Sequence, residues 1–134
     1  QEDSMKYTKI SGLTESDAGA VAKGTEIETV LKKIGHGVDY HHLTVWHSHR
    51  FVGVVSLDQA YRHYYVNGGK VKLDDRVYSE LDKLQAKVEK TATKDTILKT
   101  VLDHYNEFLK TLLVVVTDGG KVDGFATLKD ILEP

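Results

Sequence analysis

The chain has 134 residues, of which 40% are hydrophobic and 28% charged, a composition typical of one folded domain and not of a disordered segment. Eighteen basic and twenty acidic residues give a formal net charge of -2, so no positive field favours binding to a nucleic acid backbone. The absence of cysteine excludes disulfides, thiolate zinc sites and thiol nucleophiles.

Nothing in the hydropathy pattern predicts insertion into a membrane. The longest apolar run, Leu112–Val116, is far shorter than a membrane-spanning helix and suits a buried strand. The first residues, Gln1-Glu2-Asp3-Ser4, show neither the basic region nor the apolar core of a signal peptide. We therefore expect a cytoplasmic location, and the missing initiator methionine suggests a piece excised from a longer protein.

The sequence contains an internal repeat. Sliding the chain by 71 residues aligns 7–63 with 78–134 without a gap and gives ten identical pairs, among them Tyr7/Tyr78, Gly53/Gly124 and Leu57/Leu128. A repeat of this length indicates one supersecondary unit present twice. We expect repeat 1 to cover 7–66 and repeat 2 to cover 78–134, with a linker over 67–77.

In the first copy, a short strand is expected near 19–22, and a helix follows whose apolar residues recur at helical spacing. A strand over 43–46, a turn at His47-Ser48-His49, a strand over 51–55 and a helix from Ser56 complete the copy. The expected buried face of its first helix consists of Ile27, Val30, Leu31 and Ile34.

Between the copies, Asn67-Gly68-Gly69 marks a break. The spacing of Val77, Leu81, Leu84 and Val88 then predicts a helix over 74–90, with Asp74 and Asp75 at its positive end and a short strand near 86–90.

The second copy repeats the order of the first. Its first helix is expected to bury the counterparts of the first copy's face. Strands over 114–117 and 121–126 flank the turn Asp118-Gly119-Gly120, and a helix starts near Thr127. The expected buried face consists of Leu98, Val101, Leu102 and Tyr105. The fold class is therefore α/β (α+β), with two pseudo-symmetric units of helix–strand–strand–helix.

This unit resembles a CBS motif, and two in tandem resemble a Bateman module. The main carrier is 113–132 (LVVVTDGGKVDGFATLKDIL), which matches the family's strand, Asp/Gly turn, strand with a central glycine, and T-x-x-D at the last helix. The first copy carries 51–60 (FVGVVSLDQA) at the equivalent place. The resemblance extends over about residues 7–134.

The resemblance implies a regulatory module and not an enzyme. Such modules bind adenosine-containing ligands (AMP, ADP, ATP or S-adenosylmethionine) in clefts between the copies, with the T-x-x-D carboxylate on the ribose hydroxyls. They commonly form homodimers and control an attached or partner enzyme, transporter or channel. No cofactor is required for this role, and the nucleotide is a regulatory ligand.

Thr127, Lys129 and Asp130 are the main candidates for ligand binding. A helix N-terminus offers free N–H groups, the hydroxyl and ammonium suit a phosphate, and the carboxylate can accept from two hydroxyls. The same residues also fit a capping box, in which threonine and an acidic residue satisfy each other's backbone amides without a ligand. Both interpretations are open from the sequence.

The first copy departs from the motif. Ser56-Leu57-Asp58-Gln59 has glutamine where the second copy has the aspartate, and one residue on a helix is a rotation of about 100°. Asp58 therefore does not replace it, and Ser56, Asp58 and Gln59 are weaker ligand candidates. One competent site is expected, not two.

Both copies lack a proline that is frequent in the family's first core strand, where Thr44 and Leu113 stand instead. Thr44 offers a hydroxyl to a ligand, although a strand threonine is commonly explained by β-propensity alone. It is counted here among the ligand-binding candidates.

The first copy is also rich in histidine, and His47 and His49 flank a turn as H-x-H, a pattern compatible with zinc, nickel or copper. No cysteine and no H-E-x-x-H pattern accompany it, so surface histidines beside a turn are the simpler interpretation. The histidines of this region are His36, His41, His42, His47, His49 and His63.

Aromatic residues crowd the helix after Ser56, where Tyr61 and Tyr64 share a face with Leu57 and Ala60. Packing in the core or in a dimer is the first expectation and adenine stacking the second. Three functions stay open: a nucleotide sensor, a degenerate pair acting as a dimerisation or docking scaffold, and a histidine-based metal sensor.

Overall fold

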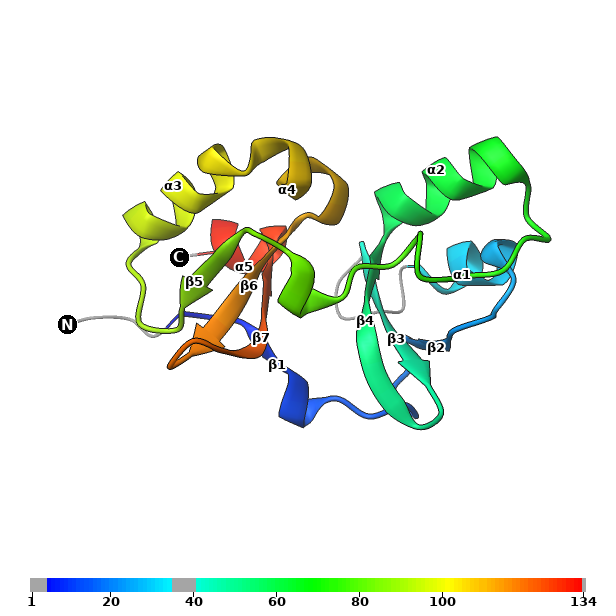
Figure 1. Ribbon diagram of the computed structural model, residues 1–134, viewed down its shortest axis with the longest axis horizontal. Coiled ribbons are helices and arrows are strands. Elements are labelled where there is room, and N and C mark those ends of the chain that lie inside the picture. The colour runs from blue at the N-terminus through cyan, green and yellow to red at the C-terminus, as the bar shows by residue number, and fades with distance from the viewer. Residues whose placement is uncertain (1–4, 35–40, 134) are drawn as a thin grey trace. The chain divides into compact units, whose positions relative to one another are not determined.

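A computed structural model describes residues 5–34 and 41–133 (Figure 1). The chain divides into two compact units, which we call the central unit (13–80) and the terminal unit (the described parts of 1–12 and 81–134). The terminal unit thus joins the first residues of the chain to its last ones. Of the described helices, none is long and apolar enough to cross a membrane.

The central unit is a three-stranded sheet covered by two helices. Its elements are β2 (Ala20–Ala22), α1 (Ile27–Lys33), β3 (His42–His47), β4 (Arg50–Ser56) and α2 (Leu57–Asn67). The strand order is β2-β3-β4, with β2 parallel and β4 antiparallel to β3. The helices α1 and α2 lie side by side (Figure 1).

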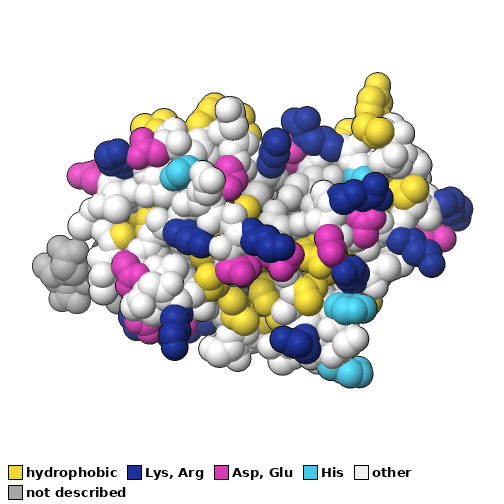
Figure 2. Space-filling view, viewed as in Figure 1, with side chains coloured by type: hydrophobic (Ala, Val, Ile, Leu, Met, Phe, Trp, Pro, Cys, Tyr) yellow, Lys and Arg dark blue, Asp and Glu magenta, His cyan; other side chains and the backbone are white. Residues whose placement is uncertain are grey.

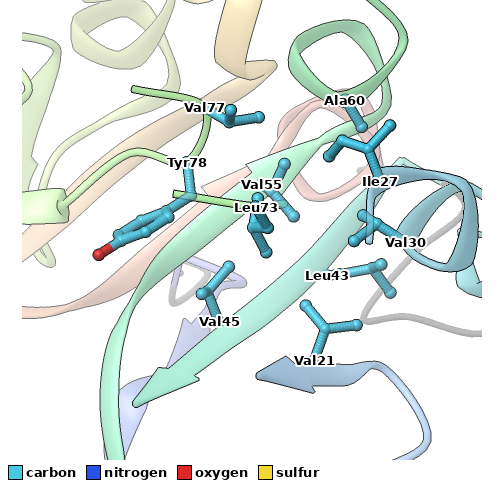
Figure 3. Packing of buried hydrophobic residues seen from close by; sticks show 10 residues of the cluster. All are labelled: Val21, Ile27, Val30, Leu43, Val45, Val55, Ala60, Leu73, Val77 and Tyr78. Atoms are coloured by element: carbon cyan, nitrogen blue, oxygen red, sulfur yellow. The ribbon is translucent and has the colours of Figure 1, made fainter. Parts of the chain in front are cut away.

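One apolar cluster holds this unit together (Figure 3). Ile27 and Val30 from α1 and Ala60 from α2 pack on Leu43 and Val55 of the sheet, and all five are fully buried. Leu73, Val77 and Tyr78, which follow α2, complete the cluster. The helical face expected from the first copy is therefore confirmed for its two deepest residues.

The terminal unit has the same plan with additions. Its elements are β1 (Thr8–Lys9), β5 (Lys87–Glu89), α3 (Lys94–Asp103), α4 (Tyr105–Thr111), β6 (Leu113–Asp118), β7 (Lys121–Thr127) and α5 (Leu128–Leu132), with short 3-10 helices at Ile10–Gly12 and Leu81–Lys83. The strand order is β1-β7-β6-β5. The mixed α/β class and the predicted hairpins of both copies are confirmed.

Each unit is completed by a segment from the start of the other copy. Thr8 pairs with Phe125 of β7, and Ser79, its partner in the repeat alignment, pairs with Val54 of β4. The matched glycines make room for these segments. A Cβ on Gly124 would lie 1.9 Å from the Thr8 carbonyl oxygen, and one on Gly53 would lie 2.3 Å from that of Ser79. Each glycine thus permits a close backbone approach.

The helix predicted over 74–90 is wrong. The segment is mostly extended or turned, with the Ser79 bridge, the short 3-10 helix and β5. Its apolar residues are buried in different places, since Val77 belongs to the central core and Val88 to the terminal one. The helix-like spacing of these apolar residues therefore reflects burial in two separate cores and not one face of a helix.

The helical face expected in the second copy is also wrong in part. The buried residue of α3 is Ile97, with Val101 partly buried beside it. Leu98 and Leu102 are exposed, the latter by 71%, because α3 turns its Ile97 side toward β5 and β6. Tyr105 is 52% exposed and begins the separate helix α4, since α3 ends at Asp103. Tyr61 and Tyr64 on α2 are likewise exposed and lie outside the central core.

Candidate functional site

The T-x-x-D residues of the second copy lie where β7 ends and α5 begins. Thr127 is the N-cap of α5, and its hydroxyl accepts from the Asp130 amide at 3.5 Å. Asp130 Oδ2 accepts from the Thr127 amide at 3.0 Å and from its hydroxyl at 3.3 Å. These contacts form a capping box. The capping interpretation is thus confirmed.

The capping box leaves part of the Asp130 carboxylate available. All of its hydrogen bonds within the described residues are made by Oδ2, so Oδ1 keeps its acceptor positions. Asp130 is half-buried, and the neighbouring Lys129 is exposed. A carboxylate oxygen beside an exposed ammonium can accept from hydroxyl groups of a ligand, while the ammonium can contact a phosphate.

The equivalent residues of the first copy are engaged within the central unit. Ser56 accepts from the Gln59 amide at 3.1 Å, and Gln59 Oε1 accepts from the Ser56 amide at 3.0 Å. The remaining Gln59 nitrogen, Nε2, donates to Ser79 Oγ at 2.8 Å. The Gln59 side chain therefore caps the N-terminus of α2 and binds the segment that follows α2 through Ser79.

Asp58 and Thr44 are also occupied. Asp58 Oδ2 accepts from Arg62 Nε at 2.7 Å, one helical turn away on the surface. Thr44 is buried, and its hydroxyl accepts from Trp46 Nε1 at 2.9 Å. Both residues remain ligand candidates only if these contacts are given up.

The histidines do not come together as a metal centre in the described part of the chain. No group of three histidine or carboxylate residues there could hold a metal ion. His49 Nδ1 lies 2.6 Å from Glu15 Oε1, and this contact raises the pKa of His49 above its ordinary value. His36 lies outside the described residues.

Charge is mixed on the face shown in Figure 2. Figure 2 shows basic and acidic side chains interspersed over the face in view. Pairs such as Lys70–Glu28 and Lys90–Asp118 neutralise each other locally. This pattern agrees with the small net charge and gives no basic stripe for nucleic acid on that face.

Two contacts at Ser79 and Glu89 escaped the sequence analysis. Ser79 holds Gln59, and Glu89 binds the turn between β6 and β7 through the amides of Gly119 and Gly120. The alignment of Ser79 with Thr8 is a signal for the first contact, because both residues lie at the start of a copy. No local pattern marks Glu89.

Comparison with known proteins finds the fold but no sequence relative: no family model matches the chain, and no curated protein does. Solved structures do match. The CBS domain of a bacterial CNNM/CorC family Mg2+ transporter, solved with ATP, has a TM-score of 0.57 at 18% identity, covering 95% of this chain and 81% of that one.

Two further structures agree. A putative signal-transduction protein with CBS domains from Burkholderia ambifaria has a TM-score of 0.60 at 16% identity, over 93% of this chain and 91% of that one. CBSX2, solved in complex with AMP, has a TM-score of 0.55 at 17% identity, over 94% and 89%.

Proposed function

We propose that this chain, whose fold is that of CBS-domain modules, is a regulatory module that binds one adenine nucleotide through Asp130, Thr127 and Lys129. The carrying observation is that Asp130 Oδ1 has no partner among the described residues, whereas both the oxygen and the nitrogen of the Gln59 side chain have partners in the central unit. Two similar folds were solved with ATP and with AMP, which supports the ligand class.

In this proposal the nucleotide's ribose hydroxyls donate to Asp130 and its phosphate contacts Lys129 and the first amides of α5. Thr127 holds Asp130 in place. Binding alters an attached or partner enzyme, transporter or channel only as far as the nucleotide prefers one conformation of the module over another. The role is regulatory and not catalytic.

The test is isothermal titration with AMP, ATP and S-adenosylmethionine in metal-free buffer. We expect one site per chain for at least one of these ligands and a loss of at least tenfold in affinity in Asp130→Asn. Asparagine keeps an oxygen for the Thr127 amide, so the cap and the fold survive. Asp95→Ala, a carboxylate in the first turn of α3, is the matched control and should bind like wild type. No heat from any ligand with a folded protein would overturn the proposal.

A second copy of the chain is the proposed partner. In the terminal unit, α3 and α4 expose Leu98, Leu102, Tyr105 and Leu109. Apolar groups gathered on a surface favour association. Sedimentation should give a dimer, and Leu102→Lys with Tyr105→Lys should give a monomer with an unchanged circular dichroism spectrum. A monomeric wild-type chain would contradict this.

The scaffold alternative rests on a specific observation, namely that every ligand candidate of the first copy already has a partner inside the central unit. A module that dimerises but gives no heat with any of the three ligands is the result that this alternative expects.

A further inference from the structure

The hairpin turn of the terminal unit carries an internal carboxylate. Glu89 lies opposite Thr117 in the register of β5 and β6. Its oxygens accept from the amides of Gly119 and Gly120, each at 3.0 Å, and from the Thr117 hydroxyl at 2.5 Å. The Thr117 contact and the two amides lower the pKa of Glu89 below its ordinary value, which shows that this turn favours an anion.

The equivalent turn of the central unit also has two residues with φ in the left-handed region but lacks the carboxylate. Ser48 and His49 have φ values of 50° and 64°, in the left-handed region that Gly119 and Gly120 also occupy. The residue in the register position of Glu89 is Ala22, which lies opposite Trp46. Within the described residues, no acceptor reaches the Ser48 or His49 amide.

A cavity of about 330 Å³ lies at this place. The strand β2 contributes Ala20 and Ala22, β3 contributes Trp46, and the turn contributes Ser48 and His49. All of its lining residues belong to the central unit. The volume falls within the range of small-molecule sites, which combine an apolar wall with a few polar groups.

The charges around the cavity are compatible with an anion. Glu15, the one carboxylate in the lining, lies 2.6 Å from His49 Nδ1, and this contact raises the pKa of His49 and so favours its positive form. Lys23 also lines the cavity, where its ammonium lies 2.5 Å from Asp75, and His47 adds a further imidazole. Non-glycine residues in the left-handed region cost backbone energy, and here they bring His49 to Glu15.

We propose that this cavity binds a small organic carboxylate. Its anionic group accepts from the Ser48 and His49 amides, as Glu89 does from Gly119 and Gly120, and its apolar body lies against Ala20, Ala22 and Trp46. The site is separate from the residues of the nucleotide proposal, and neither depends on the other.

Phenylacetate is the probe, and the only tryptophan of the chain, Trp46, is the reporter. Titration should change Trp46 fluorescence saturably and move the Ser48 and His49 amide proton resonances downfield. Phenylacetamide, which has the same ring without the charge, should bind at least tenfold more weakly. Equal binding of the two probes, or resonances that stay unmoved, would overturn the proposal.

A variant that supplies its own carboxylate gives an independent test. Ala22→Glu places a carboxylate in the register position of Glu89, so it should weaken phenylacetate binding at least tenfold and raise the midpoint of thermal unfolding. Ala22→Gln is the matched control of similar size, and it should not raise the midpoint. Phenylacetate binding to Ala22→Glu with wild-type affinity would contradict the inference.

The reciprocal change should create the site elsewhere. Glu89→Ala removes the internal carboxylate, and phenylacetate should then shift the Gly119 and Gly120 amides, which it leaves unmoved in the wild-type chain. If phenylacetate leaves the Gly119 and Gly120 amide resonances of a folded Glu89→Ala variant unmoved, these amides do not recognise carboxylates, and the proposal fails.

Discussion

The two units differ at the residue three positions after the helix cap. In the central unit this residue is Gln59, which donates to Ser79. In the terminal unit it is Asp130, which keeps one carboxylate oxygen without a partner among the described residues. At the hairpin turns the roles are reversed. Glu89 occupies the terminal turn, and the central turn faces a cavity. The central unit therefore uses the polar atoms of its own side chain at the helix cap, and the terminal unit does so at the hairpin turn. At the other position, each unit leaves polar groups available to a ligand.

The comparison teaches that a repeated backbone fixes where polar groups gather, while single residues decide whether a ligand is needed there. A helix cap and a left-handed turn both present backbone amides. At the helix cap both units satisfy the first amide, but only Gln59 uses its other polar atom on a neighbouring segment. At the hairpin turn Glu89 accepts from the amides of the terminal unit, and Ala22 provides no such acceptor in the central unit.

The largest effect is expected at the glycines that both units share. Gly124→Ala should lower the free energy of unfolding by about 3 kcal/mol, since its Cβ would overlap the Thr8 carbonyl oxygen at 1.9 Å. Gly53→Ala should act similarly through Ser79. Urea denaturation measures both. Gly12→Ala, whose Cβ would meet nothing within 4 Å, is the control, and equal stability of the three variants would refute the close approach.

A smaller loss is expected at the terminal turn. Glu89→Gln removes the anion from the Gly119 and Gly120 amides and should lower the midpoint of thermal unfolding at neutral pH. Because the folded pKa of Glu89 lies below its ordinary value of 4.5, the carboxylate stabilises the fold above that value, and this contribution disappears as the pH falls through the folded pKa. The difference between the two chains should therefore shrink in acid, and a constant difference would contradict it.

Gln59→Ala tests the corresponding contact of the central unit. The variant loses the bonds to the Ser56 amide and Ser79, so a stability loss of about 1 kcal/mol is expected in urea denaturation. Nucleotide affinity should be unchanged, since the proposed site uses Asp130. A variant that keeps its stability and loses nucleotide binding would reverse the assignment of the two units.

The smallest effect concerns the edge strand β1. The Tyr7 hydroxyl donates to Asp123, which raises the pKa of Tyr7 to about 12. The stabilisation of the fold by this hydrogen bond is present below the ordinary tyrosine pKa of 10.0 and is lost as the pH rises through the pKa of folded Tyr7. In a spectrophotometric pH titration of the tyrosines, Tyr7→Phe should lack one tyrosine that ionises at higher pH than an ordinary tyrosine. An unchanged titration curve would contradict the contact.

The repeat predicted most of the fold, because identical spacing in two copies separates strands and helices better than either copy alone. The prediction of a helix over 74–90 was wrong because the apolar residues of this segment are buried in two different cores. The cap residues Thr127 and Asp130 were identified correctly, but the sequence could not separate capping from ligand binding, since both use the same atoms. The Gln59–Ser79 contact and the cavity beside Trp46 depend on register across strands, which no local pattern carries.

The most direct test of the account is calorimetric titration of ATP into the wild-type chain, Asp130→Asn and Gln59→Ala. We predict one site per chain in the wild type, the same site in Gln59→Ala, and at least tenfold weaker binding in Asp130→Asn. Two equal sites in the wild type, or binding that survives Asp130→Asn and fails in Gln59→Ala, would contradict the division of roles between the two units.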